Sequence, residues 1–505
     1  MRNFFKTVAI VTVFSISEKF LGFIYRIYMS HKIGSEGVGI YQASLAMFGF
    51  LFMLINSGIP ITVSRLMTKY KAEGNALKVQ KIITAGLTLS LLLAMPVVFF
   101  TFILKSKLSI IFADDRCVKV FLIILPGLIF TSVYSVLRGV FWGNKDFLPY
   151  SIIELLEEIC MILVGVVLIN CATSVYDGAV KAGVAVIFSY LFSFILSVLV
   201  FIIRKNKLKN PISELKPLIL SSTPVTVMRT VASLSSSLVA IILPIGLINA
   251  GLSEAQSMSL YGSAIGQAVP ILFIPSSLIG AFTLVLIPEI SENYYKKRNI
   301  ELKNDIEKSI NFTTLLTSLF APVFLVCGKE IGVIIFNSHE CGSFLSASSF
   351  LVVFIGLSGI TTSILNSLGA ENKVLLFYVI NGVFMLLCVW LLPKFLGIYS
   401  LLIGFCFTYG LTSVLNLFLI KKKSSVKPKI FAPLIYSLIF ILPSSLIGIM
   451  VEKMLLPIMG SFITTIITSI VMMAFSFVLF LGFNLFNVQI IKNMLSRRKS
   501  KIKTA

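Results

Sequence analysis

FFKTVAIVTVFSISEKFLGFIYRIYMS, residues 4–30, is an apolar stretch long enough to cross a membrane, yet it carries charges in its interior. Glu18, Lys19 and Arg26 lie well inside it. At about 100° per residue, they share with Gly22 one helical stripe roughly 120° wide. A charge at bilayer depth costs about 2.5 kcal/mol or more unless it faces protein or water. The stretch therefore predicts a membrane helix whose charged stripe lines an internal, wet cavity.

Two other interpretations of this stretch stay open. The charges could form a structural Glu–Lys–Arg cluster that ties helices together. The first seventeen residues could instead be a cleaved signal peptide, with Arg2 and Lys6 as its basic end and residues 8–16 as its apolar part. The many apolar stretches that follow favour a membrane helix.

The composition indicates a polytopic membrane protein. Of 505 residues, 57% are hydrophobic and 13% are charged. The net charge of +22 sits mostly in short loops, which points to anionic lipid headgroups and membrane topology and not to nucleic acid. Seven isolated cysteines without a CxxC motif argue against a zinc or redox site. His339, Glu340 and Cys341 are adjacent, but a plain loop explains them better than a metal site.

Fourteen apolar stretches are long enough to span a hydrocarbon core of about 30 Å, which needs roughly 20 residues. Because backbone polar groups in lipid must be satisfied internally, all are expected to be helices, which makes the fold all-α. They lie near residues 4–31, 38–66, 81–104, 118–141, 149–170, 180–203, 217–249, 257–288, 307–327, 343–369, 374–392, 398–420, 430–450 and 459–482.

The distribution of Lys and Arg supports this count. With the N-terminus in the cytoplasm, the inner segments hold 31 of the 43 basic residues, the outer loops hold 9, and Lys19, Arg26 and Arg229 lie within spans. The bias predicts a multi-pass protein of the cell membrane with both termini in the cytoplasm.

An internal repeat follows from spacing. Pro60 and Pro288 end the second and eighth spans, and Asn144 and Asn372 follow the fourth and tenth; each pair is 228 residues apart. Six spans separate the members of a pair, so both halves keep one orientation. This predicts a parallel repeat of two six-helix lobes, related by an axis along the membrane normal.

The predicted organisation has four parts. Residues 1–216 form the first lobe and 217–422 the second, 423–482 add two C-terminal spans, and 483–505 form a basic, amphipathic cytoplasmic tail that rests on anionic lipid.

The fifth span carries Glu154, Glu157 and Glu158 in one stripe about 100° wide. Three carboxylates at that depth must meet water, basic partners or protons. We expect a proton- or cation-responsive site in which Glu157 and Glu158 titrate, or a counter-charge for a basic cavity. An equally good interpretation is a structural network with Arg138 or Lys145.

Arg229 lies near the middle of the seventh span, between Pro224 and Pro244. If the lobes are related, it faces the same cleft as Arg26. Two guanidinium groups from opposite lobes suit the oxygens of a pyrophosphate. A purely structural role for Arg229 is the alternative.

Enzyme signatures are missing from the sequence: there is no Walker A loop, no GxSxG and no HExxH. We therefore expect a transporter and not an enzyme, without a cofactor, a metal or an ATP site.

Several short motifs together resemble one known family. They are LGFIYRI at 21–27, GSEGVGIYQ at 34–42, GIP at 58–60, SR at 64–65, RG at 138–139, YG at 261–262 and PEIS at 288–291. With them, the chain resembles the stage V sporulation protein B family. That family belongs to the multidrug/oligosaccharidyl-lipid/polysaccharide exporter superfamily, which includes the lipid II flippases.

The resemblance implies a flippase for undecaprenyl-pyrophosphate-linked oligosaccharide, such as a peptidoglycan precursor, with the spore cortex as one destination. It implies fourteen helices around a central cationic cavity, and alternating access driven by an ion gradient or the membrane potential. Arg26 matches the family's basic cavity residue in the first span. From the charge pattern we add Glu18, Lys19, Arg65 and Arg229 as substrate-binding candidates. Wall-synthesis enzymes would be partners.

One departure concerns the fifth span. The family pattern Glu-Gln-x-x-Arg corresponds here to Glu157, Glu158 and, in place of the arginine, Met161. The span is thereby more acidic, which leaves the coupling ion and the exact glycan open.

Competing functions remain. A cation-coupled multidrug exporter of the same superfamily would want an acidic cavity, which the basic residues oppose and the glutamates allow. A flippase for another polysaccharide repeat unit is also compatible. A glycan polymerase or ligase would want large outer loops, and a non-transporting scaffold would not need buried cations.

Overall fold

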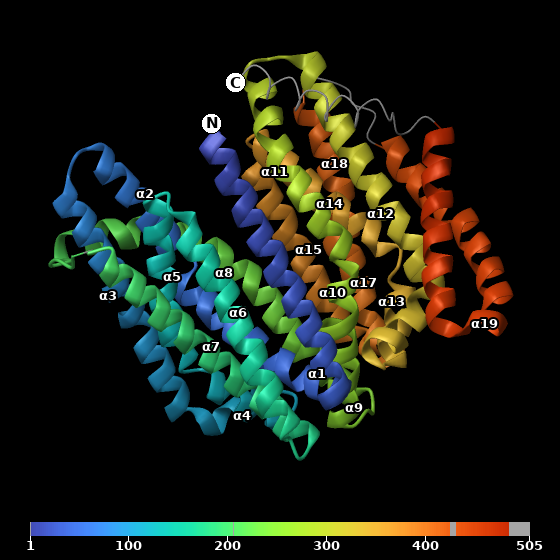
Figure 1. The fold of residues 1–505 in the computed structure, drawn as a ribbon, viewed down its shortest axis with the longest axis horizontal. Coiled ribbons are helices and arrows are strands. Elements are labelled where there is room, and N and C mark those ends of the chain that lie inside the picture. The colour runs from blue at the N-terminus through green and yellow to red at the C-terminus, as the bar shows by residue number, and fades with distance from the viewer. Residues whose placement is uncertain (1, 206, 425–430, 484–505) are drawn as a thin grey trace. The chain divides into compact units, whose positions relative to one another are not determined.

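The structure is a computed structural model that describes residues 2–205, 207–424 and 431–483. Within these ranges the chain is almost entirely helical, and no strand occurs (Figure 1). The all-α prediction is confirmed. The predicted amphipathic helix after Gly482 lies outside the described residues.

The number of membrane spans is only partly settled. In the described part, eight helices are long and apolar enough to cross a membrane, and the number is eleven if each of three bent helix pairs is one span. The predicted fourteen are not reached by this measure. Two long helices, α1 (Arg2–Asn56) and α19 (Phe431–Gly482), each contain a break, at Gly34 (φ 65°, ψ 178°) and Gly460 (φ 72°, ψ 168°). Both glycines have a positive φ that other residues rarely adopt.

The chain forms two compact units. The first comprises residues 1–267 and 386–400. After α1 it contains these helices: α2 (Ile59–Ala72), α3 (Ala76–Ile103), the 3-10 helix η1 (Lys105–Ile110), α4 (Asp115–Ile124), α5 (Gly127–Gly143), α6 (Phe147–Asn170), α7 (Val175–Ile203), α8 (Ile212–Asn249), α9 (Glu254–Tyr261), most of the π-helix η2 (Gly262–Ala268), α16 (Pro393–Leu396) and the 3-10 helix η3 (Gly397–Tyr399).

The second unit comprises residues 268–385 and those from 401 onward. Its helices are α10 (Val269–Leu272), α11 (Ile274–Tyr295), α12 (Asn299–Phe336), α13 (His339–Ala347), α14 (Leu351–Ser367), most of α15 (Glu371–Leu391), most of α17 (Ser400–Phe405), the π-helix η4 (Cys406–Leu411), α18 (Thr412–Lys423) and α19. Its core is apolar, with Ile306, Ile310, Leu357 and Leu417 all fully buried.

In the first unit, α1 packs against α6, α7 and α8, while α2 packs against α3 and α5. Ile59, Val63, Ile82 and Val136 form the centre of its apolar core. The helix α8 belongs to this unit, and the predicted division into two six-helix lobes stays a prediction.

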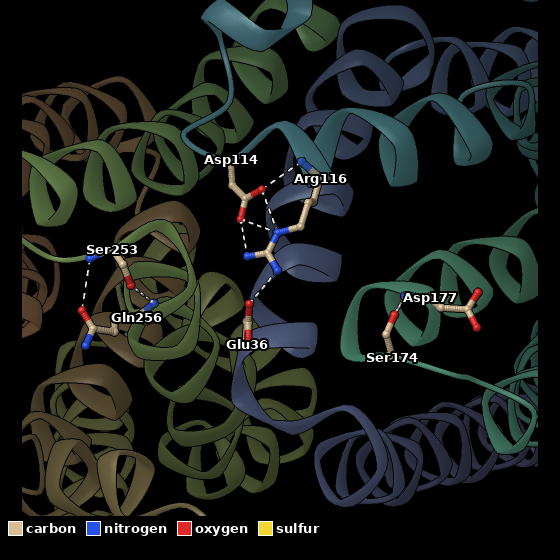
Figure 2. A network of polar contacts seen from close by, with 7 residues as sticks. All are labelled: Glu36, Asp114, Arg116, Ser174, Asp177, Ser253 and Gln256. Carbon is tan, nitrogen blue, oxygen red and sulfur yellow. Dashed lines mark hydrogen bonds and ion pairs between the residues drawn. The ribbon is translucent and has the colours of Figure 1, made fainter.

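An ion cluster joins α4 to α1 just after the break at Gly34, as Figure 2 shows. The side chain of Asp114 accepts the backbone N–H of Arg116 at 2.8 Å and thereby caps α4. The guanidinium of Arg116 contacts the same carboxylate at 2.7 Å and Glu36 on α1 at 2.6 Å. This cluster fixes the start of α4 against the second segment of α1.

Candidate functional site

The acidic stripe of α6 contacts α5 through one ion pair. Nη1 of Arg138 lies 3.1 Å from Oε1 of Glu154, and both side chains are mostly buried. Tyr150 also hydrogen-bonds to Glu154, and the guanidinium lies 5.1 Å from the ring centre of Trp142. The predicted network with Arg138 is thus confirmed for one glutamate. Lys145 takes no part in an ion pair with any other described residue.

These side chains border a pocket of about 190 Å³ inside the first unit. Four helices supply its walls: both segments of α1, together with α5, α6 and α7. The lining residues are Glu18, Phe48, Phe52, Thr131, Tyr134, Ser135, Arg138, Glu154, Glu157, Glu158 and Tyr190. We call this the glutamate pocket, because four of its five charged side chains are glutamates.

Several polar atoms at the glutamate pocket are buried without a hydrogen-bond partner among the described residues. They are Oε2 of Glu157, the hydroxyl of Tyr134 and Nε of Arg138. A side-chain hydrogen bond links Glu157 to Ser193 on α7, which leaves the second carboxylate oxygen unused. Buried polar groups are nearly always satisfied. Oε2 of Glu157 can accept a hydrogen bond or bind a proton, whereas Nε of Arg138 can only donate, so water is the guest that suits both atoms.

The contact between α1 and α6 brings the two charged stripes together. The carboxylate of Glu158 lies against Gly22, and the ring of Tyr25 lies against Gly165. The hydroxyl of Tyr28 donates to the carbonyl of Val166 at 3.2 Å. Small residues let two membrane helices approach closely, so these glycines set the separation of α1 and α6.

Arg26 lies beside the glutamate pocket but does not line it. Its side chain is partly buried, and its charge interacts with Glu158 and with the hydroxyl of Tyr41. Glu18 lines the pocket itself and interacts with Glu154 and Arg138. Lys19, the next residue, is exposed. The predicted stripe on α1 therefore divides into a pocket-lining part and an exposed part.

The other basic candidates lie elsewhere. Arg229 is exposed on α8, next to Thr230, whose hydroxyl donates to the carbonyl of Met53 on α1 at 3.3 Å. Arg65 is exposed on α2. The structure thus groups all four candidate glutamates in one pocket, with Arg26 beside them, and places Arg229 and Arg65 outside it.

Sequence comparison identifies the family. A family model described as "Polysaccharide biosynthesis protein" matches residues 4–294, more than half of the chain. The chain belongs to the polysaccharide biosynthesis protein family. The match covers every residue that lines the glutamate pocket.

Two individual relatives of this family member belong to the groups that its sequence motifs resemble. Stage V sporulation protein B of Bacillus subtilis (strain 168) is 24% identical over 391 residues, which cover 74% of this chain and 75% of that protein. Lipid II flippase MurJ of the same organism is 23% identical over 348 residues, covering 64% of this chain and 63% of that protein. The predicted relationship to both is confirmed.

The fold of this family member matches a solved flippase. The structure described as "Lipid II flippase MurJ, inward closed conformation" superimposes with a TM-score of 0.69 at 15% identity, covering 94% of this chain and all of that one. Together with its many apolar helices, these relationships make this family member a multi-pass membrane protein.

The aromatic and hydroxyl residues of the pocket were not predicted from the sequence. Tyr134 precedes Arg138 by four residues, and Thr131 precedes Tyr134 by three, so all three lie on one face of α5. On α7, Tyr190 lines the pocket, and Ser193, three residues later, hydrogen-bonds to Glu157. Polar side chains at helical spacing on an apolar helix are the signal that would have found them.

Proposed function

We propose that this protein is a flippase that moves an undecaprenyl-pyrophosphate-linked oligosaccharide across the cytoplasmic membrane by alternating access. The glycan is a peptidoglycan precursor such as lipid II, and the similarity to stage V sporulation protein B favours delivery to the spore cortex. The observation that carries this proposal is the family membership together with Arg26, a partly buried cation on a membrane helix.

In this proposal Arg26 binds the pyrophosphate. A guanidinium can donate two parallel, charge-assisted hydrogen bonds to phosphate oxygens, each worth roughly 1.5–3 kcal/mol. Glu158 interacts with Arg26 and is its counter-charge when the substrate is absent. Pyrophosphate would compete with this carboxylate for the same guanidinium. The sugar would lie in the aqueous cleft and the polyprenyl chain in lipid.

The topology belongs to the same proposal: fourteen spans with both termini in the cytoplasm. The breaks at Gly34 and Gly460 support two spans each in α1 and α19. The helix α6 is 24 residues long, enough to cross a bilayer, although three glutamates interrupt its apolar sequence. The bias of Lys and Arg supports the orientation.

The glutamate pocket is proposed to couple transport to protons or cations. Four carboxylates and one guanidinium line it, and Glu157 has an unpartnered oxygen. This excess of acid also supports a second candidate function, export of cationic drugs with cation coupling, because an acidic cavity attracts cations.

One experiment separates the two functions. The gene is expressed in a strain depleted of its lipid II flippase, and growth is measured beside resistance to ethidium. The flippase proposal expects growth to be restored without a change in resistance. Resistance without growth would favour the exporter. If expression changes neither growth nor resistance, lipid II is excluded as the substrate under these conditions.

A further inference from the structure

A second pocket of about 220 Å³ lies in the first unit, at the ends of α2, α5 and α7 and beside the start of α3. Lys71, Lys205, Lys207 and Asn144 line it on its polar side. Met67 and Ile83, both almost completely buried, contribute apolar wall. We call this the lysine pocket. It shares no lining residue with the glutamate pocket.

Long-range contacts bring the three lysines together. The ammonium of Lys71 donates to Oδ1 of Asn144, which follows α5. Lys205 comes two residues after the end of α7 and adopts a left-handed conformation (φ 52°), which turns the chain away from the helix axis. The backbone N–H of Lys209 donates to Oγ1 of Thr84 on α3 at 3.0 Å. That bond holds the connection after α7 along α3.

The lysine pocket has a strong charge imbalance. None of the described residues that line it is acidic. None of its three lysines takes part in an ion pair with another described residue. Three like charges around a partly apolar depression repel one another and raise the local concentration of anions. An anion that contacts all three would relieve this repulsion.

We propose that the lysine pocket binds a phosphate group, either in the headgroup of an anionic phospholipid or as free phosphate. Lysine is a common phosphate ligand that acts as a point charge. The buried Met67 and Ile83 give the pocket an apolar side, which favours a phosphate that carries a glycerol group. All three lysines belong to segments predicted to face the cytoplasm, where anionic headgroups lie within reach. The proposal does not depend on which substrate the protein transports.

The test is binding to the purified full-length protein in detergent, measured by isothermal titration calorimetry. The probes are dihexanoyl-phosphatidylglycerol, dihexanoyl-phosphatidylcholine and inorganic phosphate. We expect phosphatidylglycerol to bind and phosphatidylcholine not to bind. Each of the substitutions Lys71→Gln, Lys205→Gln and Lys207→Gln should weaken binding about fivefold. The triple variant should lose binding roughly a hundredfold.

The control triple variant is Lys145→Gln, Lys209→Gln and Lys216→Gln. It removes the same charge from neighbouring, exposed positions that do not line the lysine pocket, and it should bind like the wild type. Binding of inorganic phosphate alone, with the same dependence on the pocket lysines, would assign the site to free phosphate. If neither phosphatidylglycerol nor inorganic phosphate binds, or if both triple variants weaken binding equally, the proposal is wrong. Because single variants are included, a triple variant that fails to fold does not prevent the test.

Discussion

The carboxylate of Glu158 on α6 lies so close to Gly22 on α1 that a β-carbon at position 22 would come within 2.8 Å of Oε1. The carboxylate can approach this closely only because residue 22 is a glycine and has no side chain. At this position Glu158 interacts electrostatically with two residues of α1, Glu18 and Arg26. This contact couples the acidic stripe of α6 to the charged stripe of α1.

The first prediction is that Gly22→Ala changes transport without loss of folded protein. The added methyl group meets the far end of a flexible side chain, so Glu158 can move away at little cost in stability. Its displacement should lower the rate of lipid flipping in proteoliposomes. Gly49→Ala is the matched control, since this glycine is also on α1 and has nothing within 4 Å of the added carbon. Equal rates for the two variants would contradict a role for the contact.

The second prediction concerns Arg26. Arg26→Ala should abolish complementation, while Arg26→Lys should retain part of it, because lysine keeps the charge but loses the planar fork. The loss of one charge-assisted hydrogen bond corresponds to about a tenfold to hundredfold weaker binding. Lys19→Ala should have a milder effect, since Lys19 is exposed. Full complementation by Arg26→Ala at normal expression would show that the first span is structural.

The third prediction concerns the ion pair between Arg138 and Glu154. Both side chains are mostly buried, with exposures of 25% and 20%, so a double-mutant cycle with alanine should give a coupling energy of about 0.5–3 kcal/mol. Thermal unfolding in detergent measures it. The exposed pair Lys69 and Glu73, 3.8 Å apart, is the control and should give about 0–1 kcal/mol. Similar coupling energies for the two pairs would mean that burial does not strengthen the pair between Arg138 and Glu154.

The fourth prediction is that Glu157→Gln alters the pH dependence of transport more than the amount of protein. Glutamine keeps the size of the side chain and the hydrogen bond to Ser193, but unlike glutamate it cannot bind or release a proton. The profile of flipping rate against pH should therefore lose one transition. Glu73→Gln, at an exposed position on the same unit, is the control. If the pH profile of the Glu157→Gln variant is unchanged, the role of Glu157 is structural.

The fifth prediction is the topology. Single cysteines in place of Lys69, Lys207, Lys297 and Lys422 should be protected from an impermeant reagent in intact cells. Cysteines in place of Lys105 and Lys329 should react. All six positions are exposed in the structure. The native cysteines must first be replaced, because Cys171 is exposed. Outward labelling at position 207 or 422 would contradict fourteen spans.

Much of the fold was predictable from local pattern. Long apolar stretches require helices in lipid, and short motifs such as residues 34–42 carried the family resemblance. The three glutamates of α6 were predicted to share a face because helical periodicity depends only on their spacing. The number of spans was harder to predict. Gly34 and Gly460 break helices that are otherwise continuous, and composition does not show whether such a break separates two spans.

The sequence by itself determined the class of this protein, the helical character of its spans, and the residues that stand out as charged within them. Only the tertiary structure decided which of those residues meet. Glu18 joins Glu157 and Glu158 in one pocket, whereas Arg229 does not line it, and Lys71 joins Lys205 and Lys207 in another. The physical reason is that periodicity fixes the face on which a side chain lies, but the neighbour of that face depends on how all the helices pack. Close approaches such as that of Gly22 to Glu158 decide this packing, and they join residues more than a hundred positions apart.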